Sequence, residues 1–273
     1  CRMADADGRK DKIIIAGGKD MQGFTQYMPT KIVFGKAAEK ETGKLIKEFG
    51  ASRVLLVYGG ESAVKSGLLD RIKEELRQEN IVYEELSGVQ PNPRLALARE
   101  GVKKAVDMGA QLMLAVGGGS VIDTAKAVAV GAANPDIDIW DVWMGKASVC
   151  TAKPVGAVLT ISAAGSEMSD SAVITNQETG KKAGFNSDMV RPKFAVLNPE
   201  LTFTLPKYQL ACGIVDILMH TLERYFTPVS GNQLTDEIAE GLMRTLIENG
   251  KTAYEDQENY EAMSEIMWCG SLS

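Results

Sequence analysis

Histidine is almost absent from this chain: His220 is the single imidazole among 273 residues. A mechanism that needs two imidazoles therefore cannot be completed by this chain alone. Cysteine is also scarce, and Cys1, Cys150, Cys212 and Cys269 are widely scattered with no CxxC pair. This spacing argues against a zinc ribbon and against a secreted disulfide scaffold, and it fits a protein of the reducing cytoplasm.

Long apolar runs and basic clusters are missing as well. The apolar runs fall far short of the roughly 20 residues that cross a bilayer. Acidic residues outnumber basic ones by 36 to 30, giving a net charge of -6, and no Lys/Arg run is interleaved with aromatics. These features argue against nucleic-acid binding and membrane binding. Residues 1–20 contain only a short apolar patch and make a poor signal peptide, so they are treated as an N-terminal extension.

Three consecutive glycines follow an apolar run in QLMLAVGGGSVIDTAKAVAVG, residues 111–131. Leu112 to Val116 is typical of a strand buried on both faces. Gly117 to Gly119 let the backbone turn sharply, and we expect Ser120 to be the N-cap of a helix that begins near Val121. Free N–H groups at a helix start favour a phosphate or pyrophosphate. A merely flexible turn is an equally good interpretation of GGGS alone, but Asp123 and Lys126 add polar groups that a structural helix does not need.

Strands and helices alternate along the first half of the chain. The apolar strand RVLLVY, residues 53–58, is followed by Gly59, Gly60, Glu61 and Ser62, at the position where a nucleotide-binding sheet meets its ligand. Residues 26–35 are predicted to form an edge strand, 81–86 another strand, and the segments from 37, 68 and 95 helices. This β-α-β alternation predicts a parallel sheet with helices on both faces.

After Pro154 the pattern changes to short strands at 154–160 and 171–176, a turn at 178–180 and a last strand at 194–197. The chain then becomes mostly helical, with helices predicted at 208–226, 233–249 and 254–268. We therefore expect an α/β dinucleotide-binding domain over residues 21–199 and a helical domain from residue 200 to 273. With 45% hydrophobic residues, the chain has enough apolar material for both.

Asp216 and His220 lie four residues apart, so on a helix they sit about 6 Å apart along the axis on one face. A carboxylate and an imidazole at this spacing can share zinc or ferrous iron, but such a site usually needs at least three protein ligands. Spacing alone favours a simpler interpretation by about two to one, in which the histidine is buried and hydrogen-bonded to the aspartate.

Six blocks in order resemble the iron-containing alcohol dehydrogenases, most closely the butanol-dehydrogenase-like, NADPH-dependent branch. The resemblance runs from about Phe24 to Ser273, through QYMPTKIVFG, VQPNP, GGGSVIDTAK, LTISAAGSE, RPKFAVLNPELTFTLP and GIVDILMHTLERYF. It implies a dehydroquinate-synthase-like fold of the class α/β plus all-α. The N-terminal nucleotide domain and the helical metal-binding domain of this fold enclose the active site between them.

The resemblance also implies roles for individual residues. Gly118, Gly119 and Ser120 would hold the pyrophosphate with Asp123 nearby, and Lys182 would reach the ribose. Thr160 and Ser162 fall in the second cofactor loop, where Ala164 replaces the usual glycine. Asn92, in the VQPNP block, is counted with the cofactor site, and Asp216 and His220 match the first two of four metal ligands. The remaining two ligands are histidines beyond MWCGSLS, so we expect a chain shorter than its family by roughly its last hundred residues, with impaired metal binding.

The implied reaction is hydride transfer between NADP(H) and a primary alcohol or aldehyde, with iron favoured over zinc and a homodimer possible. NADP(H) is favoured over NAD(H) because Gly59 stands where NAD-linked relatives carry aspartate, which leaves room for a 2′-phosphate; Glu61 is the contrary evidence. Two alternatives stay open. One is a dinucleotide-binding fragment without catalysis, and the other is a zinc-dependent polyol dehydrogenase of the glycerol type.

Overall fold

The computed structural model describes residues 23–228 and 231–273. The expected N-terminal extension, residues 1–20, lies outside the described residues. The side chains of Glu61 and Ser62 lie outside them too, although their backbone belongs to helix α2, Glu61–Lys65.

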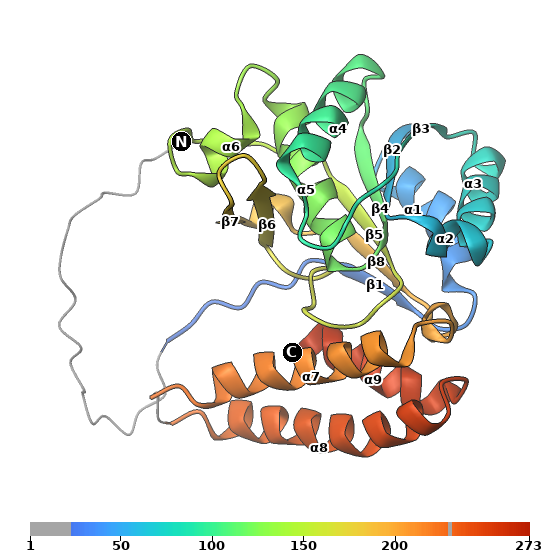
Figure 1. Ribbon diagram of the computed structural model, residues 1–273, viewed down its shortest axis with the longest axis vertical. Coiled ribbons are helices and arrows are strands. Elements are labelled where there is room, and N and C mark those ends of the chain that lie inside the picture. Colours follow the sequence, from blue (N-terminus) through green and yellow to red (C-terminus); the bar gives the residue numbers. More distant parts are fainter. Residues whose placement is uncertain (1–22, 229–230) are drawn as a thin grey trace.

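Six parallel strands form the central sheet, in the order β1-β8-β5-β4-β2-β3 (Figure 1). They are β1 Lys31–Phe34, β2 Arg53–Tyr58, β3 Val82–Leu86, β4 Leu112–Gly117, β5 Val155–Leu159 and β8 Phe194–Leu197. The uninterrupted apolar runs at β2, β4 and β8 are buried along almost their whole length, as their composition predicts. The predicted edge strand is confirmed as β1, although it is shorter than expected.

Helices cover both faces of this sheet, which confirms the predicted α/β class. One face carries η1 Ala38–Glu41, α1 Thr42–Glu48 and α3 Leu68–Gln78, whose apolar residues pack on Val54 and Leu56 of β2. The other face carries α4 Leu95–Asp107 and α5 Gly119–Ala133, which pack on Leu55 and Val57. Successive residues of β2 thus enter two different cores, as side-chain alternation along a strand requires.

The chain changes direction across the sheet between β2 and β4. From β2 it runs outward to β3 and then returns to the other side of β2 as β4, so Tyr58 at the end of β2 pairs with Val116 near the end of β4. Open parallel sheets bind ligands at such a switch point, in the crevice outside the carboxyl ends of the strands. The Gly59-Gly60 turn and the triple-glycine turn therefore meet at one edge of the sheet.

A small antiparallel hairpin lies beside the sheet, formed by β6 Ser171–Asn176 and β7 Lys181–Asn186. The predicted turn at 178–180 connects them, but β7 has no strand signal in the sequence, because KKAGFN is too polar to stand out as a strand. Helix α6, Ile139–Trp143, and the short η2, Asp188–Val190, were missed as well. The hairpin packs on α5 through Ala172 and Ile174, so it brings β7 close to the start of that helix.

Three long helices form a layer at the carboxyl-terminal side of the sheet (Figure 1). After η3, Pro199–Thr202, come α7 Lys207–Tyr225, α8 Gln233–Glu255 and α9 Tyr260–Leu272. The predicted position of the break between the last two helices was wrong. Helix α8 continues past residue 249 to Glu255, because Ala253 remains buried and continues the helical pattern. Helix α9 begins instead after Asn259, whose side chain accepts a hydrogen bond from the Ala262 N–H. None of the helices in the described part of the chain combines the length and the hydropathy of a membrane span.

Candidate functional site

The triple-glycine turn between β4 and α5 forms one wall of the candidate site. Helix α5 begins at Gly119, and Gly118 is its N-cap, because the N–H groups of Val121 and Ile122 both donate to the Gly118 carbonyl. The prediction that Ser120 is the N-cap was therefore wrong: the helix starts earlier and includes Ser120 in its first turn. The expected helix start at this edge of the sheet is still present, and its first N–H groups have no acceptor within the helix.

Gly118 and Gly119 have different surroundings. A Cβ on Gly118 would lie 2.3 Å from Cγ2 of Ile161, so the turn is packed against the β5–β6 loop, residues 160–170. A Cβ on Gly119 would meet nothing nearer than the Ser166 Cβ at 3.7 Å. Gly118 thus permits close packing, whereas Gly119 leaves the mouth of the turn open to a ligand.

A cleft of about 360 Å³ opens in front of this turn. Residues from widely separated parts of the chain line it, among them Asn92, Gly119, Ser120, Asp123, Lys182 and Asp216, together with the β5–β6 loop. The cleft thus unites the start of α5, the β7 strand and helix α7. Six of the predicted site residues, separated by up to 124 positions in sequence (from 92 to 216), meet in one hollow.

Lys182 and Asn92 face each other across the cleft. The Lys182 Nζ donates to the Asn92 Oδ1 at 3.0 Å. Asn92 has a left-handed backbone with φ of 59°, which asparagine tolerates better than most residues. The contact holds an exposed cation in the cleft that the N-terminus of α5 also lines, so the two could bind the same anionic ligand.

Asp123 lines the cleft, but both of its carboxylate oxygens are already bonded. Oδ1 accepts from the Ser166 hydroxyl at 2.6 Å, and Oδ2 accepts from the Val173 N–H at 3.0 Å. Burial raises the pKa of this carboxyl, while the Lys126 ammonium and the two hydrogen bonds act in the opposite direction. Asp123 therefore ties α5 to the β5–β6 loop and to β6.

Thr160 and Ser162 do not line this cleft, although their neighbours Ile161 and Ala163 do. Thr160 lines a separate hollow together with Pro206 and Gln209, at the junction of the sheet with the helical layer. Ser162 is 8% exposed, and its hydroxyl has no partner among the described residues. A Cβ on Gly270 of α9 would lie 3.2 Å from the Ser162 Cβ, so this serine is buried against α9. The structure places these two residues in the loop that was predicted, but not against the cleft.

Gly59 and Gly60 follow β2 at the neighbouring turn. The Gly59 carbonyl accepts from the Gly88 N–H at 3.0 Å, which connects the turn to the end of β3. A Cβ on Gly59 would come no closer than 3.5 Å to the Val89 carbonyl oxygen, and one on Gly60 would meet no atom within 4 Å. The turn has room beside it. The predicted contribution of the Ser62 side chain lies outside the described residues.

Asp216 and His220 lie one turn apart on α7, with Asp216 Oδ1 at 3.7 Å from His220 Nε2. Their side chains are 47% and 36% exposed, so the alternative of a fully buried histidine does not hold. A carboxylate and an imidazole suit iron or zinc, but no group of three or more His, Cys, Asp or Glu residues suitable for a metal exists in residues 23–228 and 231–273. The pair therefore fits part of a metal site, and further donors are needed to complete one.

Asp216 also borders a second hollow, of about 530 Å³. Its walls are mostly apolar and include Ile161, Ala163, Val215 and Met219. Ile161, Ala163 and Asp216 line both hollows. An apolar substrate in this space would lie next to a ligand bound in the cleft and next to the carboxylate of Asp216.

Comparison with known families and structures agrees with this geometry. Residues 29–199 match the family described as iron-containing alcohol dehydrogenase, and residues 210–273 match the C-terminal part of the Fe-containing alcohol dehydrogenase family. This chain belongs to the iron-containing alcohol dehydrogenase family. Solved members share the fold: a Thermotoga maritima structure described as NADH-dependent butanol dehydrogenase A superposes with a TM-score of 0.90 at 42% identity, covering 93% of this chain.

Curated relatives include NADH-dependent butanol dehydrogenase A of Clostridium acetobutylicum, which is 45% identical over 93% of this chain, and the NADPH-dependent aldehyde reductase YqhD of Escherichia coli, 40% identical over 92%. This chain spans about 64% of the length of each of these relatives and of the Thermotoga structure. The family resemblance and the fold inferred from the sequence are thus confirmed.

Proposed function

We propose that this chain carries the dinucleotide site and two metal ligands of an oxidoreductase. The reaction is transfer of a hydride between NADP(H) and a primary alcohol or aldehyde. The observation that supports the proposal is the shared cleft, in which the start of α5, Lys182 and Asp216 line one space. Membership of the iron-containing alcohol dehydrogenase family supports the same reaction class.

The described residues suggest a division of roles. The first turn of α5, at Gly119 and Ser120, would bind the pyrophosphate through free N–H groups and the positive end of the helix dipole. Lys182 would hold the ribose, and its ammonium is held in place by the hydrogen bond of 3.0 Å from Lys182 Nζ to Asn92 Oδ1. The apolar hollow beside Val215 and Met219 would take the alkyl chain of the substrate. When bound, a divalent metal at Asp216 and His220 would act as a Lewis acid on the substrate oxygen.

The turn after β2, at Gly59 and Gly60, bears on the coenzyme preference. Gly59 leaves no carboxylate to repel a 2′-phosphate, and the space beside Gly60 is open, which supports NADP(H). The names of the relatives point both ways. The Clostridium relative is described as NADH-dependent and the Escherichia coli relative as NADPH-dependent. We therefore propose NADP(H) as the preferred coenzyme and NAD(H) as the second candidate.

Titration of NADPH and NADH against the tryptophan fluorescence of the protein tests the coenzyme assignment, because it needs no turnover. We expect NADPH to bind more tightly and Gly59→Asp to shift the preference toward NADH. The matched control is Gly241→Asp on α8, where a Cβ would meet only the Arg244 guanidinium at 3.9 Å; it adds the same charge away from the cleft and should leave the ratio unchanged. Tighter binding of NADH to the wild-type protein would contradict the NADP(H) proposal.

A second candidate function is dinucleotide binding without catalysis. It is favoured by the incomplete ligand set among the described residues, because Asp216 and His220 supply two donors where a competent site usually has at least three. An aldehyde reduction assay with NADPH and added Fe²⁺ or Zn²⁺ separates the two functions. Activity that depends on the metal supports the oxidoreductase, and cofactor binding without turnover supports the second function.

Activity on glycerol with zinc and NAD would support a polyol dehydrogenase instead. We also propose that the chain forms a homodimer, and light scattering of the same sample would test this.

A further inference from the structure

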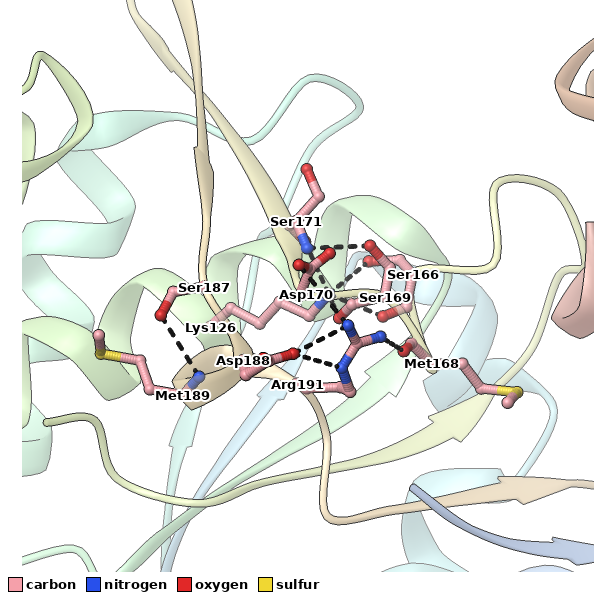
Figure 2. A network of polar contacts seen from close by, with 10 residues as sticks. All are labelled: Lys126, Ser166, Met168, Ser169, Asp170, Ser171, Ser187, Asp188, Met189 and Arg191. Atoms are coloured by element: carbon pink, nitrogen blue, oxygen red, sulfur yellow. Dashed lines mark hydrogen bonds and ion pairs between the residues drawn. The ribbon is translucent and has the colours of Figure 1, made fainter. Parts of the chain in front are cut away.

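Lys126 is a charged side chain that is fully buried, with 0% of its surface exposed. It lies two turns into α5, behind the candidate dinucleotide site, and its ammonium points into the β5–β6 loop (Figure 2). Burying a charged amine is unfavourable unless it is fully hydrogen-bonded. The partners of this amine therefore show what it does in the fold.

The Lys126 Nζ donates to three backbone carbonyls, those of Ser166 at 2.7 Å, Ser169 at 2.9 Å and Ser171 at 2.7 Å. It also lies 3.3 Å from the Ser166 hydroxyl. An ammonium has three N–H donors, so one side chain satisfies three carbonyls in a segment of six residues. These carbonyls point toward Lys126. A side chain without N–H donors at this position would remove one hydrogen bond from each of them.

The segment held in this way is part of the cleft wall. Ala163, Gly165, Ser166 and Glu167 of the β5–β6 loop line the cleft together with Gly119. The loop is also tied from its outer side by Arg191, which donates to the Met168 carbonyl at 2.7 Å. A further contact joins it to α9, where the Ser271 hydroxyl donates to the buried Glu167 carboxylate at 2.6 Å. Lys126 connects the loop carbonyls directly to the helix whose N-terminus faces the ligand.

We propose that Lys126 is a positioning residue of the dinucleotide site, which holds the β5–β6 loop in place as the wall opposite the first turn of α5. The inference rests on the proposed dinucleotide function. Lys126 itself does not reach the ligand, because its whole side chain lies inside the protein. It acts by fixing the position of Ser166 and its neighbours relative to Gly119.

The charge of Lys126 also links the loop to the ligand. Burial has the largest effect and lowers the pKa of the ammonium to about 8, while the carboxylates of Asp123, Glu167 and Asp170 raise it and Arg191 lowers it. A bound pyrophosphate at the start of α5 would lie about 10 Å away along the helix axis. At that distance and an effective dielectric constant near 20, the attraction to each negative charge of the pyrophosphate corresponds to roughly tenfold in affinity, and salt reduces it.

The sign of the pH effect follows from this linkage. Below pH 8 the lysine is charged in both the free and the bound protein, so the affinity for an anionic dinucleotide does not depend on its titration. Above pH 8 the free protein loses this proton, and binding must take it up again. The affinity therefore falls as the pH rises. NADH is the better probe here, because it has no 2′-phosphate that titrates.

The test compares wild type with Lys126→Met, which keeps the length of the side chain and removes the ammonium. We expect the NADH dissociation constant of the variant at pH 7 to rise roughly tenfold to a hundredfold, because three buried carbonyls lose a charged donor. We expect the wild-type constant to rise roughly threefold to tenfold between pH 7.5 and 9.5, and the variant to show no such rise. Equal affinity and an equal pH profile in the two proteins would overturn the proposal.

Lys104→Met is the matched control. Lys104, on α4, also donates to a backbone carbonyl, that of Glu85 at 3.2 Å, but it lies outside the cleft. Its replacement should leave the NADH affinity and the pH profile unchanged. If Lys126→Met does not fold, the wild-type pH profile still decides: a dissociation constant that is flat from pH 7.5 to 9.5 would overturn the proposal.

Hydrogen exchange without any nucleotide separates this inference from the proposed function. Peptides that cover residues 164–173 should exchange at least tenfold faster in Lys126→Met than in wild type or Lys104→Met at pH 7. If neither NADH nor NADPH binds to wild type, the proposed function fails, and faster loop exchange still supports the positioning role. Unchanged exchange in the loop would overturn that role whether or not a nucleotide binds.

Discussion

The two halves of the candidate site are held in very different ways. On α5, Asp123 accepts two short hydrogen bonds and Lys126 donates three, all with the β5–β6 loop and β6, and strand β4 beneath them is fully buried. On α7, Asp216 and His220 make one contact of 3.7 Å with each other, and both are at least a third exposed. The proposed dinucleotide half is thus held by hydrogen bonds within the protein, whereas the proposed metal half would need donors that residues 23–228 and 231–273 do not supply.

The difference follows from what each element packs against. Helix α5 lies between the sheet and the β6–β7 hairpin, so most of its surface is buried. Helix α7 packs on one side only and leaves Val215, Met219 and Phe226 exposed. Polar groups surrounded by protein must find partners within it, whereas those on a solvated helix face need none. Substitutions in the two halves should therefore have effects of very different size.

The largest contrast concerns one phenylalanine from each half, Phe194 in the sheet and Phe226 at the end of α7. Phe194 of β8 is fully buried and stacks on Phe49, with ring centroids 5.7 Å apart. Phe194→Ala should lower the free energy of unfolding by about 3–5 kcal/mol, because it removes the ring and leaves a cavity. Phe226→Ala, at a residue that is 74% exposed at the end of α7, should change it by less than about 0.5 kcal/mol. Urea denaturation of the two variants measures the contrast, and equal losses would show that the two positions contribute equally to stability.

The second contrast is in the pH dependence of stability. Burial lowers the pKa of Lys126 from 10.5 to about 8, so between these values only the unfolded chain holds the proton and the free energy of unfolding rises with pH. Burial raises the pKa of the Cys269 thiol of α9 from 9.0 to about 11, so between these values only the folded chain holds the proton and the free energy falls. Each of the two groups changes the free energy of unfolding by up to about 3 kcal/mol across its window.

The two windows overlap in wild type, so variants are needed to separate them. Lys126→Met should lose the rise and keep the fall, and Cys269→Ala should do the opposite. Urea denaturation at pH 7.5, 9 and 10.5 provides the measurement, and differences from wild type cancel the other titrating groups. A pH-independent difference for both variants would contradict the assignment of the two pKa shifts.

The third prediction concerns the open glycine of the dinucleotide half. Gly119→Val should weaken NADPH or NADH binding at least about tenfold, because its branched side chain would fill the space in front of the first turn. The stability should change little, since a Cβ at this position makes only an ordinary contact of 3.7 Å. Gly241→Val, at a position on α8 where a Cβ would meet only the Arg244 guanidinium at 3.9 Å, is the control for a β-branched residue in a helix. Wild-type affinity in Gly119→Val would remove the triple-glycine turn from the site.

The smallest effect is expected at the metal pair. Without a ligand, Asp216→Ala and His220→Ala should each change the free energy of unfolding by less than about 1 kcal/mol, because a solvent-exposed contact of 3.7 Å contributes little. The 273-residue chain should bind Fe²⁺ or Zn²⁺ weakly, and either substitution should weaken that binding further. Calorimetric titration with each metal measures this. Stoichiometric metal that resists dialysis would mean that further donors, for example from a second copy of the chain, complete the site.

Local sequence patterns were sufficient for much of the fold. The apolar runs of β2, β4 and β8 and the change to helices near residue 200 were predicted with nearly the observed bounds, because buried parallel strands have a strong and local signal. The strand β7 was missed for the opposite reason. Its polar sequence has no such signal, and its pairing with β6 and the contact of Phe185 with Trp143 make it a strand.

The sequence by itself also determined which residue types were available: one histidine, a glycine turn between a buried strand and a helix, and an Asp-His pair at helical spacing. Only the tertiary structure decided which of them share a space. It brought Asn92, Lys182 and Asp216 to one cleft, and it placed Ser162 against α9 instead. It also showed that the polar Lys126 of the predicted helix is a buried tether for three carbonyls. Such outcomes depend on packing between distant segments, which spacing along one chain does not specify.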